Sequence, residues 1–541
     1  MRSAEVEAYI ARLTPNPAFA DFFRRYGVHY RWYALLTIVT GNIAAVLAGT
    51  IINVAIPDIM GAFGIGQDDA QWLSTANLAA STVAMLASAW LVLRVGLKDT
   101  VLIAMSLFLA GSVIGGLATN TEVMIISRIM QGVTAGLLTP LSMTIIFQVF
   151  PAGRQGLAMG LSAVGVILAP AIGPAVGGVL IDTLDWRYVF FLGVPFSLFT
   201  LFGSIAFLPG RQAASAPPFH WTGMILLTTS IMAMLIGLTH GERDGWDSLP
   251  ILGCFALATI AGAAFLGSQR GRAQPLLDVT LFANRNFSIM ALNGFVFSAG
   301  LYASTYLIPL FLQLVQRLTP TGSGVMMIPA GLAMVLIFPF AGRLADRLDP
   351  RLLISTGILF FVLAFWLLRS ADANTAFATM AWWIVLSRIG VGLVMPALQM
   401  HALASVTPER LTQASGSFNF VRQLGGAFGV NLMSVVLERR RSVHADQLAA
   451  TQTWGNSDTM ESLQQLQGLG SAIGHVGTDQ WNAAVGFLRQ MVDAQALQAG
   501  FSDSFVILAF AFLLTMLPTL ALRPRRRVGT STGMKAKTAT A

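Results

Sequence analysis

Long apolar runs recur along the whole 541-residue chain and restrict what it can fold into. A helix that crosses the roughly 30 Å hydrocarbon core of a bilayer needs about 20 apolar residues. Fourteen runs reach this length, and they are too long and too uninterrupted for the strands of a membrane barrel. Only 11% of the residues are charged, against roughly 25% in soluble domains. The sequence therefore predicts an all-α polytopic membrane protein. The expected spans are 32–57, 72–95, 100–118, 122–148, 156–181, 187–208, 221–239, 249–267, 287–315, 322–341, 352–369, 375–400, 413–437 and 503–522.

The basic residues predict how these spans are oriented. With fourteen spans, both termini lie on one side, and the segments on that side hold 22 of the 33 Lys and Arg residues. The positive-inside rule therefore places both termini in the cytoplasm. The run Glu438–Arg441 conflicts with this placement because it falls on the outer side. It opens a long loop, 438–502, and long loops carry little weight in the rule.

The segments outside the spans carry weaker signals. Residues 1–31 contain Phe22, Phe23 and Tyr26 beside two arginines, which fits either an interfacial helix or a disordered tail. Residues 523–541 form a basic cytoplasmic tail that anchors the topology and does not indicate nucleic acid. In the loop 438–502, two stretches with helical apolar spacing predict two amphipathic helices. These helices could cover a cavity, bind a partner or do neither.

Two motifs recur in register and predict an internal repeat. The fourth span contains ISRIMQGVTAGLLTPLSM (126–143), and the twelfth contains LSRIGVGLVMPALQM (386–400). The loop GRLADRLDPR (342–351) has a degraded counterpart, AWLVLRVGLK (89–98), after the second span. We therefore expect an N-terminal six-helix half (32–208), two inserted helices (209–270) and a C-terminal six-helix half (271–522). Parallel six-helix repeats are typical of secondary transporters, whose substrate site lies between the halves.

The fifth span is rich in glycine and proline, which are disfavoured in the interior of a helix. Small residues let two membrane helices approach closely, and prolines bend a helix. The spacing of the glycines and prolines in this span therefore fits either a sliding contact between two halves or tight static packing. The glycines that share one helix face are Gly165, Gly173, Gly177 and Gly178, and the prolines among them are Pro170 and Pro174.

These motifs together resemble those of one family. GPAVGG (173–178) is similar to the antiporter motif of major facilitator exporters, and RIMQG (128–132) and GRLADRLDPR are similar to two other motifs of that superfamily. With TIINVAIPDI (50–59), SGSFNFVRQLGGAFG (415–429) and fourteen spans, residues 32–522 resemble the EmrB/QacA-type drug:proton antiporters.

This resemblance implies a function and a set of moving parts. It implies the major facilitator fold in a bacterial inner membrane, with proton-driven export of hydrophobic compounds by alternating access. It implies that the glycine stripe faces the opposite half, and that Gly342, Asp346 and Arg347 also act in the conformational change. For members of the EmrB branch it further implies a periplasmic adaptor and an outer-membrane channel as partners.

One residue departs from the family pattern. Family members commonly carry an aspartate at the position of Ala48, and this acid is their usual candidate for proton coupling or for holding a cation. The central parts of the spans contain no Asp or Glu, whereas Arg128, Arg388 and Arg422 lie within spans. Because an intramembrane charge is costly unless it is compensated, these arginines are functional-site candidates, with helix carbonyls as the alternative partners. A cavity of this kind favours amphipathic organic anions or neutral lipophiles over cations.

The candidate site residues follow from this reasoning. Buried amides join helices as often as they bind substrate, so the polar candidates remain open to both interpretations. Without an acid at position 48, the substrate could also carry its own proton. The proton-coupling candidates are Arg128, Asp58, Glu122, His401 and Glu438. The cavity candidates are Asn42, Thr50, Asn53, Gln71, Asn77, Gln131, Gln148, Arg388, Asn419 and Arg422.

Other classes of protein lack their motifs in this chain. There is no phosphate-binding loop for an ATP-driven pump, and the six histidines and one cysteine show no metal-binding spacing. We therefore expect no enzyme, cofactor or metal, and small molecules, protons and lipids as partners. The alternative function is a substrate-specific exporter or importer of the same fold. Its substrate would be an aromatic acid, a fatty acid or a siderophore, without proton coupling through a first-span acid.

Overall fold

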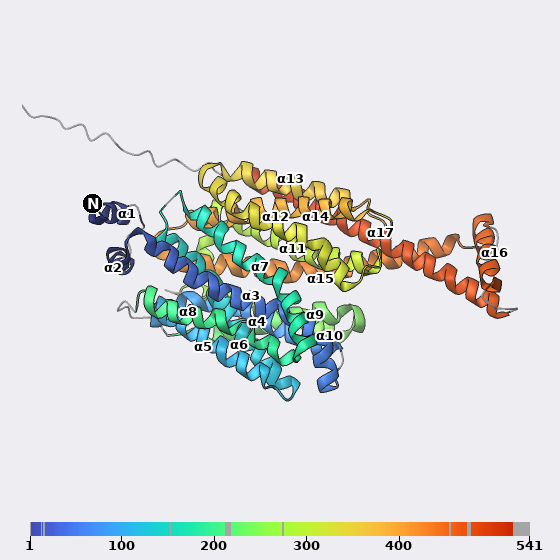
Figure 1. The fold of residues 1–541 in the computed structure, drawn as a ribbon, viewed down its shortest axis with the longest axis horizontal. Helices are drawn as coiled ribbons and strands as arrows, with labels where there is room; N and C mark the ends of the chain where they lie inside the picture. Colours follow the sequence, from blue (N-terminus) through green and yellow to red (C-terminus); the bar gives the residue numbers. More distant parts are fainter. Residues whose placement is uncertain are drawn as a thin grey trace, which may run out of the picture.

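The computed structural model describes residues 2–11, 13, 17–65, 67–151, 153–210, 218–272, 275–453, 456–472 and 478–522. These residues form helices and no strand, which confirms the all-α prediction (Figure 1). Thirteen helices among them are apolar and long enough to cross a membrane. The remaining expected span is α7 (Gln155–Thr183), whose 29 residues are also long enough to cross. The expected tail, 523–541, lies outside the described residues.

Six helices form a first group, in which α3 and α6 are central. Helix α3 packs against α6, α7 and α8, and α6 packs against α4 and α5. The bounds of this group, with α7 as above, are α3 (Tyr30–Phe63), α4 (Gln67–Val95), α5 (Leu97–Gly116), α6 (Thr121–Val149) and α8 (Val194–Phe207).

A second group of six helices repeats this pattern of contacts. Helix α11 packs against α14, α15 and α17, and α14 packs against α12 and α13. The same pairs meet in the same order along the chain in both groups. The bounds are α11 (Arg285–Leu314), α12 (Pro320–Arg347), α13 (Pro350–Leu368), α14 (Phe377–Ala404), α15 (Leu411–Thr451) and α17 (Thr478–Leu520).

The two helices between the groups pack mainly on each other. These are α9 (Trp221–Asp244) and α10 (Leu249–Gln269). Helix α9 also touches α4 and α15, so the pair lies beside the place where the two groups meet.

The N-terminal segment is helical and packs on protein. It forms α1 (Arg2–Ile10) and α2 (Pro17–Tyr26). Phe23 is fully buried, and its ring lies 5.2 Å from that of Tyr9 and 4.9 Å from that of Tyr30. The Tyr9 hydroxyl donates a hydrogen bond to the Val149 carbonyl oxygen at 3.1 Å. These contacts fasten the segment to the ends of α3 and α6.

Removing the Tyr9 hydroxyl is expected to destabilise this attachment. Burial raises the pKa of Tyr9, although neighbouring Arg31 lowers it, so the phenol stays protonated and donates its proton to Val149. Tyr9→Phe should therefore cost about 1 kcal/mol and lower the melting temperature of the purified protein in a fluorescence scan. Tyr33→Phe is the matched control, because Tyr33 is exposed and its hydroxyl bonds no described residue. Equal effects of the two changes would contradict the assignment.

The segment 438–502 differs from the expected loop with two separate helices. Helix α15 continues to Thr451 and α17 begins at Thr478, so both spans extend beyond the rest of the bundle as a helical hairpin. Helix α16 (Ser457–Ala472) lies at its tip (Figure 1). The first expected amphipathic helix is α16, and the second is the first part of α17. Apolar content ends near residue 437, but good helix formers continue, which explains the longer helices.

The bundle has two ends, which we name by their landmarks. The N-terminal face carries α1 and α2, and the α16 face lies at the opposite end (Figure 1). Helices α4, α6 and α12 end at the N-terminal face, and α7 begins there.

Candidate functional site

The two groups of helices touch most closely where α7 meets α12 at the N-terminal face. A Cβ atom at Gly156 would clash with the carbonyl oxygen of Gly342, and one at Gly342 with that of Gly156. One turn further along α7, a Cβ at Gly160 would clash with the carbonyl oxygen of Phe338. Glycine is therefore required on both sides for the backbones to meet.

Asp346 bonds the start of α7 across this contact. Its carboxylate accepts hydrogen bonds from the backbone N–H of Gly156 at 2.8 Å and of Leu157 at 3.0 Å. A carboxylate at a helix N-terminus satisfies free N–H groups and interacts favourably with the helix dipole. The aligned position in the first repeat is Leu93, so the symmetry-related contact has no such carboxylate.

Neutralising Asp346 is expected to weaken closure of the N-terminal face. Asp346→Asn removes the charge at the α7 terminus, which should destabilise the closed state by about 1–2 kcal/mol, or roughly 5–30-fold in population. With Cys254 replaced by serine, a cysteine at buried Ser88 should then react faster with a maleimide. Asp349→Asn is the control, because among the described residues the Asp349 carboxylate bonds only its own helix, through Arg351 N–H. Unchanged labelling in the Asp346 variant would show that this bond does not hold the face closed.

Helix α15 makes the second contact between the groups, against α4 and α6. A Cβ at Gly416 would lie 2.8 Å from the Met85 carbonyl oxygen. The Ser415 hydroxyl donates to the Pro140 carbonyl oxygen at 2.9 Å, and Asn419 Nδ2 lies 3.0 Å from the Met143 sulfur. These residues belong to the parts of α4 and α6 near the N-terminal face, so this contact closes the same end.

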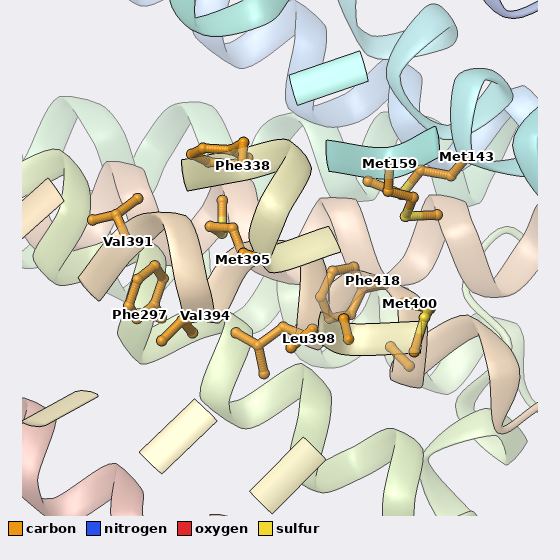
Figure 2. Close-up of a cluster of buried hydrophobic side chains, with 14 of the residues drawn as sticks. Met143, Met159, Phe297, Phe338, Val391, Val394, Met395, Leu398, Met400 and Phe418 are labelled. Carbon is orange, nitrogen blue, oxygen red and sulfur yellow. The ribbon is translucent and has the colours of Figure 1, made fainter. Parts of the chain in front are cut away.

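A methionine-rich apolar cluster lies next to this contact (Figure 2). Met143 and Met159 come from the first group, and Met395, Met400 and Phe418 come from the second. Methionine is flexible and polarisable, so this packing adapts to different neighbours.

The glycine stripe of α7 packs on its own group, so the expectation that it faces the opposite half is wrong for this conformation. A Cβ at Gly165 would lie 2.9 Å from Val39, one at Gly173 3.0 Å from Leu47, and one at Gly177 2.7 Å from Ile51. All three neighbours belong to α3, whereas Gly156 and Gly160 face α12. Spacing shows which glycines share a face but not which helix covers that face. The side chains of Pro170 and Pro174 and the surroundings of Gly178 lie outside the described residues.

Arg128 is buried inside the first group. Its Nε donates to the Leu73 carbonyl oxygen at 3.0 Å, and its Nη1 donates to the Ala48 carbonyl oxygen at 2.9 Å and to Gln131 Oε1 at 2.7 Å. Its Nη2 is buried without a hydrogen-bond partner among the described residues. The guanidinium thus lies beside the backbone of the position where the family acid is expected, and its partners are two helix carbonyls and Gln131.

Arg388 occupies the matching place in the second group. It is 4% exposed, and its Nη1 donates to the Ser304 hydroxyl at 3.2 Å. Its Nη2 also lacks a partner among the described residues. Both repeats therefore bury an arginine whose charge is incompletely compensated.

Of these three arginines, Arg422 lies on α15, one turn from Asn419 at the second contact between the groups. It is half-buried on α15, and its Nη2 and Nε lie 3.3 and 3.4 Å from Asn419 Oδ1. Within the described part of the chain, no ion pair includes Arg128, Arg388 or Arg422. The guanidinium of Arg422 is the one that is both accessible and free of strong bonds.

Three of the polar cavity candidates instead join helices of the first group. Asn42 donates to the Ser142 hydroxyl, Asn77 donates to the Arg128 carbonyl oxygen at 3.1 Å, and Gln131 donates to the Ser112 hydroxyl at 3.2 Å. Thr50 bonds its own helix through the Val46 carbonyl oxygen at 3.0 Å. Gln148 has a buried Oε1 without a described partner. The side chains of Asn53 and Gln71 lie outside the described residues.

The structure brings none of the acidic coupling candidates into an ion pair with Arg128. Asp58 and Glu122 are exposed, and Glu438 lies 3.5 Å from Arg441. His401 is half-buried at the end of α14, with Nδ1 2.8 Å from the Ala397 carbonyl oxygen.

Four residues that close the N-terminal face were not predicted from the sequence. They are Gly156 and Gly160 on α7, and Ser415 and Gly416 on α15. Gly156 and Gly160 precede the glycine stripe with the same four-residue spacing, and this signal could have identified them. Ser415 and Gly416 are small residues in an already noted motif. Their partners become visible only when the helices are placed.

Comparisons with known proteins agree with this architecture. The model of the Major Facilitator Superfamily matches residues 38–430. The multidrug transporter protein MdtP of Bacillus subtilis is 31% identical over 408 residues, which cover 74% of this chain and 75% of MdtP. The multidrug export protein EmrB of Escherichia coli K12 is 29% identical over 474 residues, which cover 87% of this chain and 91% of EmrB.

Solved structures share the fold. The human organic anion transporter MFSD10 aligns with a TM-score of 0.60 at 14% identity, over 90% of this chain and 99% of that one. The proton:xylose symporter XylE aligns with a TM-score of 0.57 at 15% identity, over 92% of this chain and 96% of XylE. The chain therefore belongs to the Major Facilitator Superfamily and is similar to its EmrB-type multidrug transporters.

Proposed function

We propose that this protein exports amphipathic organic anions or neutral lipophiles across a bacterial inner membrane, by proton-coupled antiport with alternating access. The observation that carries this proposal is the charge inside the bundle. Arg128, Arg388 and Arg422 bring positive charge there, and none of them pairs with a carboxylate among the described residues. Relatives named as multidrug transporters support export of more than one compound.

The charge favours anions for an electrostatic reason. Two unit charges 4 Å apart interact with about 4 kcal/mol at an effective dielectric constant of 20, before desolvation is subtracted. Arg422 is the residue we assign to a substrate carboxylate or phenolate, because its guanidinium is accessible at the contact between the groups. The methionine-rich cluster supports the breadth of substrates, since flexible apolar surfaces repack around different molecules.

Alternating access here rests on two rigid halves, 32–208 and 271–522, with 209–270 as an inserted pair. The repeated helix pairs support this division. With both termini in the cytoplasm, the contacts at Gly156–Gly342 and Ser415–Pro140 close the cytoplasmic side. The loading state then requires both contacts to separate. Proton coupling completes the cycle. The proton is carried either by the substrate itself or through one of the candidate residues Arg128, Asp58, Glu122, His401 and Glu438.

Transport direction distinguishes an exporter from an importer of the same fold. A radiolabelled hydrophobic weak acid should accumulate in inside-out vesicles when their interior is made acidic, and a protonophore should abolish this accumulation. Vesicles with the Gly342→Leu variant serve as the control, because a side chain there prevents the closing contact. Accumulation only in right-side-out vesicles would indicate an importer.

We further propose that the helical hairpin of α15 and α17 binds a periplasmic adaptor, which leads to an outer-membrane channel. Phe487 and Met491 lie one turn apart on α17 and are 51% and 48% exposed, which supports an apolar contact. Phe487→Ser with Met491→Ser should leave transport in vesicles unchanged and remove adaptor co-purification. Lost vesicle transport in this variant would place the hairpin within the transport step instead.

A further inference from the structure

Three consecutive arginines, Arg439–Arg441, lie on α15 just beyond its predicted membrane span. Two of them border a recess that the proposed transport mechanism does not use. The recess has a volume of about 390 Å³ and is lined by Val436, Arg439, Arg440, Val443 and Ile507. The four α15 residues share one helix face, and Ile507 belongs to the adjacent α17. The recess is therefore lined by apolar side chains of both helices, with the two arginines beside the valines on the α15 side.

The guanidinium of Arg439 has no acidic partner among the described residues, and that of Arg440 makes one long ion pair. Neither Arg439 nor Arg440 makes a hydrogen bond to a described residue, and no described acid pairs with Arg439. Arg440 lies 3.7 Å from Asp503, and its side chain is 50% exposed. The next arginine, Arg441, differs because it pairs with Glu438 at 3.5 Å and does not line the recess.

We infer from the neighbouring residues that the recess lies at the level where the bundle leaves the membrane. Ser502, beside Asp503, donates a hydrogen bond to the Arg369 carbonyl oxygen at 2.9 Å. The Arg369 guanidinium lies 4.7 Å from the centroid of the Trp366 ring, and Trp366 is 48% exposed. Exposed tryptophans with adjacent arginines mark the head-group level of a bilayer. Arg440 contacts Asp503 at this same level.

We propose that this recess binds an anionic phospholipid of the leaflet at the α16 face. Arg439 and Arg440 donate hydrogen bonds to the phosphate, and Val436 and Ile507 contact the first part of the acyl chain. Basic recesses between membrane helices suit anionic head groups, and an apolar wall selects a ligand with a tail. This site also explains why an arginine run lies on the side that the positive-inside rule disfavours. The proposal is independent of the exported substrate.

Lipid binding to the purified full-length protein tests this assignment. Native mass spectrometry would follow phosphatidylglycerol binding, with phosphatidylcholine and inorganic phosphate as the comparison ligands. Because each arginine at a membrane surface contributes about fivefold in affinity, R439Q with R440Q should weaken phosphatidylglycerol binding by roughly 25-fold. R441Q is the matched control in the same run and should bind as the wild type does.

Each other outcome overturns the proposal in a defined way. Unchanged binding in the double variant would remove the two arginines from the site. An equal loss in R441Q would indicate diffuse surface charge. Equal binding of phosphatidylcholine would exclude selection for an anionic head group, and displacement by inorganic phosphate at similar concentration would indicate a free-phosphate site.

Discussion

Replacing Gly156 with leucine is expected to abolish transport while the protein still folds and inserts. The backbones of α7 and α12 meet at Gly156 and Gly342, where even a Cβ would clash with a carbonyl oxygen. A larger side chain must hold the two helices apart, because a backbone atom cannot rotate away as a flexible side chain does. Transport in vesicles should fall by at least about 100-fold, since every cycle in alternating access passes through the closed state.

Whether the Gly156→Leu protein is held with its N-terminal face open can be measured separately from transport. A cysteine at Ser88 lies near the other closing contact, so its faster maleimide labelling in the Gly156→Leu background would show that the whole face opens. Gly331→Leu is the matched control, because a Cβ at Gly331 in α12 meets nothing within 4 Å. Retained transport in the Gly156 variant would contradict the assignment of this contact as the closing contact.

Introducing an acid at position 48 is expected to change substrate preference. The Ala48 carbonyl oxygen already accepts a hydrogen bond from Arg128 Nη1 at 2.9 Å, so Ala48→Asp places a carboxylate next to an incompletely compensated guanidinium. The new negative charge should compensate Arg128 and lower the local positive potential. We expect the ratio of organic-acid to lipophilic-cation transport to fall by at least about tenfold.

Ala48→Asn separates charge from size in this experiment. The amide has nearly the same volume and no charge, so it should leave the acid-to-cation ratio close to that of the wild type. An equal change in both variants would show that bulk at position 48, rather than charge, determines preference.

The membrane spans could be predicted from sequence because the length and composition of an apolar run report directly on a bilayer crossing. The buried arginines could be predicted for the same reason, since Arg128 and Arg388 lie within such runs. The partners could not. Gly173 and Gly156 look alike in sequence, yet one faces α3 and the other faces α12, because helix placement depends on contacts between distant segments.

The hairpin and the N-terminal helices show a second limit. Hydropathy marks where α15 leaves the membrane but not where the helix ends, so its extension to Thr451 was not expected. The aromatic residues of the N-terminal segment fit a lipid surface equally well in sequence. Their burial against Tyr9 and Tyr30 depends on the ends of α3 and α6, which the sequence does not place.

Quenching of a pH gradient in inside-out vesicles tests the central claim most directly. Vesicles that contain the protein would receive organic acids in one series, neutral lipophiles in a second and lipophilic cations in a third. The account predicts that acids or neutral lipophiles dissipate the gradient and that cations do not. Dissipation by cations would contradict an anion-favouring interior built on Arg128, Arg388 and Arg422.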